Sequence, residues 1–229
     1  MNFQIRKYLN SLQIECKEVL RLGNVGDGGW NICNDDEYRP RKNCTVISIG
    51  INNDFSFDDA IANEYGCMVY SFDPSMDKKD YRRSDHVQFY AIGLSANDSP
   101  LGNWKMNRLQ TIKRKLGLSK IDVLKMDIEE NEQTTITDMF ANNTMDGVLQ
   151  FVFEIHVDSN AVTKSKNAKT DLSPRRNKYL QSLANLRIIY NAGYRIFSAH
   201  QNPYSLFRYK KTRTRFTCHE ISTIKIKLD

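Results

Sequence analysis

Short apolar runs alternate with helical patterns along most of the chain. Runs rich in β-branched residues predict strands, and apolar residues spaced three or four apart predict helices. The predicted strands are 44–49, 68–72, 87–92, 121–126, 148–155, 195–198 and 220–226. The predicted helices are 56–65, 107–116, 132–140 and 179–192. Strands that alternate with helices in this way predict an α/β fold with a mostly parallel sheet, covered on both faces.

The chain length and the position of one long polar stretch predict the domain organisation. The 229 residues predict a single domain that spans 1–229. The alternation of elements is interrupted at 158–178, which is rich in Lys, Asn and Ser. This stretch predicts a basic loop excursion between a strand and the next helix. Long loops of this kind are often functional, and we expect this one to be mobile and to act as a lid.

Charge is unevenly distributed, and long apolar segments are absent from the sequence. Residues 1–150 hold 18 Lys+Arg and 22 Asp+Glu, whereas residues 151–229 hold 15 and 5. The basic C-terminal third is compatible with an anionic substrate, a nucleic acid or a membrane surface, and equally with a solubilising face. No signal-peptide core or membrane span is recognisable in the sequence. This predicts a cytoplasmic chain, or one of the secretory pathway if it is an N-terminal truncation.

Five cysteines occur at irregular spacing and without a Cys-x-x-Cys pair, which predicts no structural zinc site. Cys44 and Cys67 lie among apolar residues and are predicted to be buried as small hydrophobic side chains. A Cys33–Cys44 disulfide is the alternative if the chain is secreted.

Ligands of open α/β sheets bind at the carboxyl ends of the strands, so the residues that follow each strand are the first candidates. Gly50 ends the first predicted strand, and Asp73 ends the second, 23 residues later. A glycine at the first turn and an acid about 20 residues further on, which accepts hydrogen bonds from ribose hydroxyls, are typical of a pocket for an adenosyl ligand or a dinucleotide such as NAD. The Gly-x-Gly-x-x-Gly fingerprint is absent, which argues against the dinucleotide. A capping carboxylate in an Asp-Pro turn is the alternative for Asp73.

A second polar group follows the fourth and fifth strands, and consists of Asp127, Glu129, Glu154 and His156. Within each pair the residues are two apart, so they share a face of the strand. We expect the four to converge on the cavity that holds Gly50. Carboxylates with an imidazole suit a general base or a hard metal ion. Helix capping and pairing with Lys or Arg are the alternative.

Two further segments carry distinctive residues. Trp30 follows a glycine-rich turn, which predicts either a ring that lies over a ligand or an ordinary core tryptophan. The stretch 208–215 alternates basic and polar residues, which favours an exposed hairpin over a phosphate-binding segment.

Several ordered motifs together resemble one protein family. They are Gly-Asp-Gly-Gly-Trp-x-x-Cys at 26–33, Val-Ile-Ser-Ile-Gly-x-x-Asn-Asp-x-Ser-Phe-Asp at 46–58, Glu-Tyr-Gly-Cys-x-Val-x-x-Phe-Asp-Pro at 64–74, and Leu-Lys-x-Asp-Ile-Glu at 124–129. They continue with Glu-Ile-His at 154–156 and Cys-His-Glu at 218–220. This order resembles animal methyltransferase-like proteins with a type-22 methyltransferase domain, which are related to the FkbM-type enzymes. The resemblance covers about 23–226.

The resemblance implies a class I fold that depends on S-adenosylmethionine, with a Rossmann-like, seven-stranded, doubly wound sheet whose last strand is antiparallel. It implies that the loop after Gly50 approaches the methionine part of the cofactor and that Asp73 holds the ribose hydroxyls. Asp127 would lie near the amino group or the reacting atom. The cofactor-binding residues expected are Gly50, Asn52, Asp54, Asp73 and Gly93.

The function implied is methyl transfer from S-adenosylmethionine to an oxygen or nitrogen acceptor. Asp127 or His156 is the expected base, and Glu154 completes the catalytic set. Asn52 and Glu130 stand where the family tends to have glycine. Asparagine tolerates a left-handed backbone better than most residues. The alternative, which these two positions favour, is a catalytically inactive module that binds an adenosyl ligand or a partner.

Overall fold

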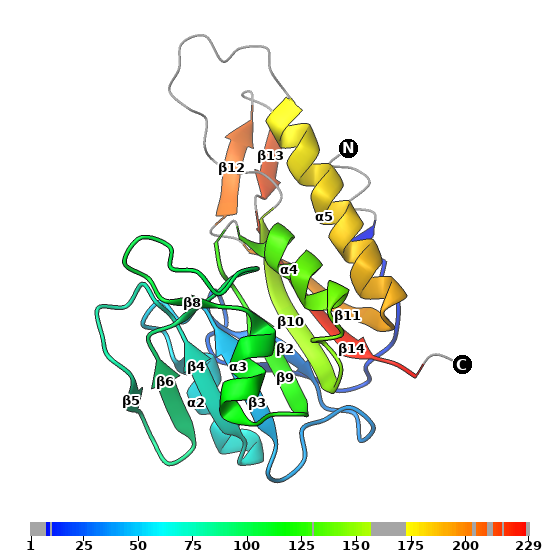
Figure 1. Cartoon of the computed structure of the whole chain (residues 1–229). Coiled ribbons are helices and arrows are strands. Elements are labelled where there is room, and N and C mark those ends of the chain that lie inside the picture. The colour runs from blue at the N-terminus through cyan, green and yellow to red at the C-terminus, as the bar shows by residue number, and fades with distance from the viewer. Residues whose placement is uncertain are drawn as a thin grey trace.

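An eight-stranded sheet forms the centre of the computed structural model (Figure 1). The structure describes residues 8–9, 11–129, 131–156, 173–202, 205–209, 213–216 and 218–227. The strand order is β11 (Tyr194–Gln201), β14 (Cys218–Lys225), β10 (Val148–His156), β9 (Ile121–Met126), β3 (Thr45–Ile49), β4 (Met68–Phe72), β6 (Val87–Tyr90) and β5 (Tyr81–Arg82). β14 runs antiparallel to both of its neighbours, and β5 runs antiparallel to β6. The seven strands that the resemblance implies are therefore present, and β5 adds an eighth at the edge.

Helices cover both faces of this sheet. They are α2 (Ser56–Tyr65), α3 (Leu109–Leu116), α4 (Glu132–Ala141) and α5 (Ser173–Asn191). Figure 1 shows α3, α4 and α5 on the side that faces the viewer, whereas α2 lies behind the sheet. The hairpin of β1 (Val19–Leu22) and β2 (Trp30–Cys33) covers the same face as α2. The remaining short pairs are β7 (Gly93–Leu94) with β8 (Met106–Asn107), and β12 (Leu206–Tyr209) with β13 (Arg213–Phe216).

Alternating residues of the central strands divide the core into two layers. Ile47 and Phe151 point toward α3, α4 and α5, whereas Val46 and Val152 point toward α2 and the β1–β2 hairpin. All four are fully buried, as expected for strands covered on both faces. This alternation decides which polar side chains near the strand ends reach the site, because residues two apart share a face.

Most predicted elements are confirmed, and the differences have identifiable causes. α2 has the predicted bounds and ends at Gly66, which is left-handed. α5 begins at Ser173, six residues before its predicted start, so the last part of the predicted 158–178 excursion is helical. The part at 158–172 lies outside the described residues. The hairpin predicted at 208–215 is confirmed as β12 paired with β13. The β1–β2 hairpin was not predicted, because its strands are short and its turn is rich in glycine.

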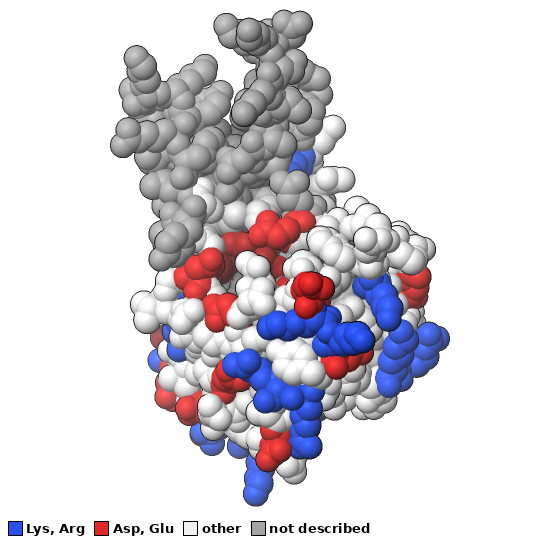
Figure 2. Space-filling view, turned by 90° about the vertical axis from the view of Figure 1, so that its left-hand side faces the viewer, with Lys and Arg blue, Asp and Glu red and all other residues white. Residues whose placement is uncertain are grey.

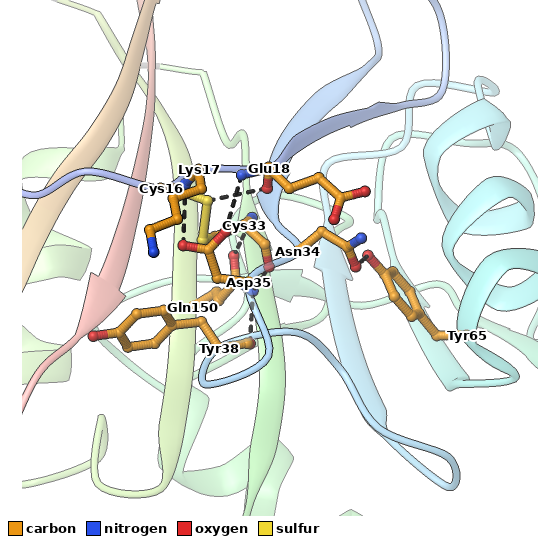
Figure 3. Close-up of a disulfide and its surroundings, with 9 residues drawn as sticks. All are labelled: Cys16, Lys17, Glu18, Cys33, Asn34, Asp35, Tyr38, Tyr65 and Gln150. Carbon is orange, nitrogen blue, oxygen red and sulfur yellow. Dashed lines mark hydrogen bonds between the residues drawn. A yellow bond between two sulfur atoms is a disulfide. The ribbon is translucent and has the colours of Figure 1, made fainter.

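The cysteine expectations are corrected by two disulfides. The Cys33–Cys44 pairing is wrong, because Cys33 bonds to Cys16 and thereby ties the segment before β1 to the end of β2 (Figure 3). Around this disulfide, the Asp35 carboxylate accepts the backbone N–H groups of residues 17 and 18 at 3.0 and 2.9 Å. The Gln150 side chain of β10 both accepts from and donates to the Cys33 backbone, at 2.9 Å in each case. The β1–β2 hairpin is therefore fixed to the central sheet.

The second disulfide joins two residues that were predicted to be separate small hydrophobic side chains. Cys44 directly precedes β3, Cys67 directly precedes β4, and the two are bonded. Both are buried as predicted, at 3% and 0% exposed. The pairing was not apparent because the two residues are 23 apart in sequence and meet only when β3 and β4 align. Within the described part of the chain, no helix is both long enough and apolar enough to cross a membrane.

Candidate functional site

A cavity of about 670 Å³ opens at the carboxyl ends of the central strands. It lies where β3 and β9 are neighbours and the chain continues to opposite sides of the sheet, which is the usual position of ligands in this kind of fold. All nine residues singled out from the sequence line it: Gly50, Asn52, Asp54, Asp73, Gly93, Asp127, Glu129, Glu154 and His156. The two predicted groups therefore share one cavity, and the roles of their members remain predictions.

Position 50 requires glycine, because the backbone of Asp127 at the end of the neighbouring strand β9 leaves no room for a side chain. The φ of Gly50 is +81°, and a Cβ built there would lie 1.6 Å from the carbonyl oxygen of Asp127. The close approach is thus between the ends of β3 and β9. Asn52 also has a left-handed backbone, with φ of 45°. An asparagine at this position is accordingly compatible with the turn.

Asp73 organises the turn that follows β3. Its Oδ2 accepts the backbone N–H groups of Ile51 and Asn52 at 2.8 and 2.7 Å. Its Oδ1 accepts the backbone N–H and the hydroxyl of Ser75 at 2.7 and 2.6 Å. Burial opposes ionisation, but these hydrogen bonds outweigh it and lower the pKa of Asp73. Asp73 therefore acts as a turn cap within the protein, and contact with a ribose stays a prediction.

A buried polar network lies beneath the cavity and was not predicted. Lys125 of β9 is 6% exposed, donates its Nζ to the carbonyl oxygen of Gly50, and lies 5.6 Å from the centre of the Trp30 ring. Asp58 of α2 is 1% exposed and accepts the hydroxyl of Ser48 at 3.3 Å. Burial raises the pKa of Asp58 although the Lys125 charge opposes this. Trp30 is both buried and part of the cavity wall.

His156 lies at the centre of the acidic group. Its Nδ1 is 2.5 Å from Oε1 of Glu132, a residue of α4 whose side chain is fully buried. Its Nε2 is 3.2 Å from Oε2 of Glu129 and 3.4 Å from Oε2 of Glu154. Burial opposes protonation, but the contacts with Cys218, Glu129 and Glu132 outweigh it and raise the pKa of His156.

The carboxyl groups around His156 differ in their protonation behaviour. Burial and the neighbouring charge of Asp127 raise the pKa of Glu154 to about 8. Burial also raises the pKa of Asp127, whose Oδ1 has no hydrogen-bond partner among the described residues. The hydrogen bond from His156 lowers the pKa of Glu129. Glu129 has a left-handed φ of 45°, a conformation that is costly for a glutamate and typical of functional sites. Glu130 lies outside the described residues.

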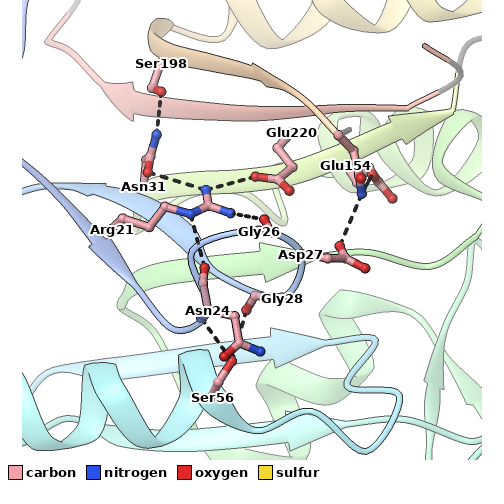
Figure 4. A network of polar contacts seen from close by, with 11 residues as sticks. Arg21, Asn24, Gly26, Asp27, Gly28, Asn31, Ser56, Glu154, Ser198 and Glu220 are labelled. Carbon is pink, nitrogen blue, oxygen red and sulfur yellow. Dashed lines mark hydrogen bonds and ion pairs between the residues drawn. The ribbon is translucent and has the colours of Figure 1, made fainter. Parts of the chain in front are cut away.

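A further polar network connects the β1–β2 hairpin to the cavity (Figure 4). Arg21 donates to Oε2 of Glu220 at 3.0 Å and to the carbonyl oxygen of Gly26 at 2.8 Å. The Asn202 amide donates to Asp27 and to Glu154, at 3.2 Å in both cases. Asp27 and Asn202 line the cavity and were not predicted as site residues. The signal for Asp27 was its position among the glycines before Trp30.

Acidic residues outnumber basic ones on the cavity wall. The acidic residues that line it are Asp27, Asp54, Asp58, Asp73, Asp127, Glu129 and Glu154, and the basic ones are Lys125 and His156. Figure 2 shows acidic side chains gathered on one face of the molecule, above a belt of Lys and Arg. Such a lining attracts cationic ligands and repels anionic ones.

Comparisons with known proteins give consistent matches. A family model for a type-22 methyltransferase domain matches residues 3–221. The chain is similar to probable methyltransferase-like protein 24 of Homo sapiens, with 27% identity over 170 residues that cover 66% of this chain and 46% of that protein. The Rattus norvegicus protein of the same name is 27% identical over 169 residues, with the same coverage. The chain thus spans about half the length of these relatives.

Among solved structures, an rRNA methylase from Streptococcus thermophilus aligns with 82% of this chain and 90% of its own chain. The TM-score is 0.42 and the sequence identity is 8%.

Proposed function

The chain belongs to the type-22 methyltransferase domain family, and from this premise we propose that it binds S-adenosylmethionine in the cavity and transfers the methyl group to an oxygen or nitrogen acceptor. The observation that carries the proposal is the meeting of Gly50, Asp73 and Asp127 in one cavity at the switch point of the sheet. A pocket in this position, with a carboxylate at the end of the second strand, suits an adenosyl ligand.

The charge of the cavity supports this cofactor. S-adenosylmethionine carries a positive sulfonium, a positive ammonium and one negative carboxylate group, and its net positive charge is favoured by a wall rich in acidic residues. The same wall repels an acceptor with a negative charge. We therefore favour a neutral hydroxyl or amine acceptor over the anionic one that the overall charge of the sequence suggested.

Methyl transfer requires the acceptor to lose a proton as its new bond to carbon forms, while the sulfur becomes a neutral thioether. Asp127 is the proposed base, because this residue lines the cavity and its buried Oδ1 has no hydrogen-bond partner in the described part of the chain. His156 is the weaker candidate, because its contacts with Cys218, Glu129 and Glu132 raise its pKa and so favour the protonated form. Glu154 accepts the Asn202 amide at 3.2 Å and forms part of the same cavity wall.

Calorimetric titration of the chain with S-adenosylmethionine, S-adenosylhomocysteine and NAD tests the cofactor assignment. We expect both adenosyl ligands to bind and NAD not to bind, and we expect Tm to rise with either adenosyl ligand. An excess of ligand of a hundredfold over Kd adds about 2.7 kcal/mol to the free energy of unfolding. Absence of binding and of a Tm shift at millimolar concentration would contradict the proposal.

The two disulfides indicate the cellular compartment of the protein. Disulfides persist in oxidising compartments and are rare in the cytosol, so we propose a location in the secretory pathway rather than the cytoplasm. The test is alkylation of the unfolded, unreduced protein isolated from its own cells, followed by mass measurement. With Cys218 outside both disulfides, one of the five cysteines should be labelled before reduction and all five afterwards. Five labels before reduction would place the protein in a reducing compartment.

A further inference from the structure

Three potential metal ligands converge on one wall of the cavity. Glu154 and His156 lie two apart on β10, and Cys218 lies directly opposite His156 on the antiparallel strand β14. The three side chains share one face of the sheet, and their ligand atoms all lie within 4.8 Å of one another. All three residues are buried, and all three line the cavity.

The orientation of His156 is the one that metal ligands adopt. Metal-bound histidines usually donate the N–H of their other ring nitrogen to a carboxylate, which fixes the ring. Here the buried carboxylate of Glu132 occupies that position, 2.5 Å from Nδ1. Nε2 then points toward Glu154 and the cavity, with the Glu154 oxygen 3.4 Å away.

The carboxyl groups around Nε2 of His156 also favour the binding of a cation. The buried carboxylates of Glu132 and Glu154 and the exposed carboxylate of Glu129 surround one imidazole, and the buried Oδ1 of Asp127 has no hydrogen-bond partner among the described residues. Buried carboxylates that crowd together need a proton, a basic side chain or a metal ion between them. A proton on Nε2 is the simplest occupant, and a metal ion in the same place would satisfy more of the oxygens.

The chemistry of the three ligands selects the kind of metal. Magnesium and calcium prefer oxygen ligands only, whereas a thiolate and an imidazole together suit zinc and similar divalent transition ions. Catalytic zinc sites commonly use three protein ligands and leave the fourth position open. We propose that Glu154, His156 and Cys218 bind one divalent ion of the zinc class, with the open position facing the cavity.

This site needs neither S-adenosylmethionine nor methyl transfer, so it is tested on the metal alone. The chain is stripped with a chelator, dialysed against Zn²⁺, and analysed for bound metal, and affinity is measured by competition with a chromophoric chelator. We expect one Zn²⁺ per chain. Cys218→Ser and His156→Gln should each weaken binding at least tenfold, whereas His86→Gln, at an exposed position far along the sheet, should leave it unchanged.

Cobalt substitution gives a spectroscopic test for the sulfur ligand. Co²⁺ bound through Cys218 gives a thiolate-to-metal charge-transfer band, which should disappear in Cys218→Ser while Co²⁺ bound to His86→Gln retains it. Far-UV circular dichroism and a cooperative thermal transition show that the variants are folded. Absence of bound Zn²⁺ in the wild type, or a Co²⁺ complex without the charge-transfer band, would overturn the proposed site. Zinc binding without any adenosyl binding would refute the proposed function alone.

Discussion

Replacing Asp73 by asparagine separates its structural role from its proposed role in cofactor binding. Asparagine has nearly the same size, so the buried position, 4% exposed, remains filled. Its amide oxygen can still accept the N–H groups of Ile51 and Asn52, which Oδ2 accepts at 2.8 and 2.7 Å. Its NH₂ group cannot accept the Ser75 N–H that Oδ1 now accepts at 2.7 Å. The substitution therefore removes the charge and leaves the Ser75 N–H unmatched, and the Ser75 hydroxyl, which donates to Oδ1 at 2.6 Å, must turn away.

The expected effect follows from the strength of charged hydrogen bonds. Each contributes about 1.5–3 kcal/mol, and tenfold in affinity corresponds to about 1.4 kcal/mol. If the ribose donates to the Asp73 carboxylate, Asp73→Asn should raise the Kd for S-adenosylhomocysteine at least tenfold. The loss of a matched donor should also lower the free energy of unfolding by about 1–3 kcal/mol.

The matched control is Ser75→Ala. All four acceptor positions of Asp73 are occupied by the chain itself, and the Ser75 hydroxyl, 2.6 Å from Oδ1, is the donor that can turn away most easily. Removing it frees an acceptor position for the ribose, so the Kd should stay the same or fall. Titration calorimetry at pH 7 measures both variants. An unchanged Kd in folded Asp73→Asn, or a tenfold rise in Ser75→Ala alone, would refute the assignment of the ribose to Asp73.

The lowered pKa of Asp73 also predicts the pH range of its contribution to stability. A carboxyl group whose folded pKa is lower than its unfolded value, about 3.9, stabilises the fold fully above that value. The contribution is lost as the pH falls through the folded pKa. The difference in unfolding free energy between wild type and Asp73→Asn should therefore be constant from pH 5 to 8 and should shrink in strong acid.

Two further substitutions test the fold around the site by urea unfolding. Gly50→Ala should lower the free energy of unfolding by at least about 3 kcal/mol, because the left-handed backbone is strained and the new Cβ would lie 1.6 Å from the Asp127 carbonyl oxygen. Gly66→Ala is the control: no atom lies within 4 Å of its new Cβ, so it should cost only about 1–2 kcal/mol. Equal losses in the two variants would contradict this reasoning. Arg21→Met should lower the free energy of unfolding by about 3 kcal/mol, because it leaves the Glu220 carboxylate, whose side chain is 6% exposed, without the Arg21 charge. The double variant with Glu220→Gln should recover most of that lost stability, because the buried charge is then removed.

The spacing of apolar residues was sufficient to predict the main strands of the sheet and its helices, because a strand that is buried on both faces is a recognisable apolar run. The position of the site also followed from the sequence, since polar residues after strands meet at one edge of a parallel sheet. Lys125 escaped prediction because a lysine within the apolar run 121–126 gives no sign of what its Nζ reaches. Cys218 was not predicted as a site residue, because it is 62 positions from His156 and the two become neighbours only through the pairing of β10 with β14.

The position of the Cys44–Cys67 disulfide implies a gradient of rigidity along the central strands. It joins β3 and β4 just before they begin, whereas the cavity opens where they end. Each strand has five residues, so about 16 Å separates the covalent link from the ligand edge, at 3.3 Å per residue. Local opening should accordingly begin at the ligand edge, and amide hydrogen exchange should slow from Ile49 back toward Thr45. The crosslink thus joins the two strands covalently at one end, whereas hydrogen bonds alone hold the ligand edge and can rearrange around a ligand.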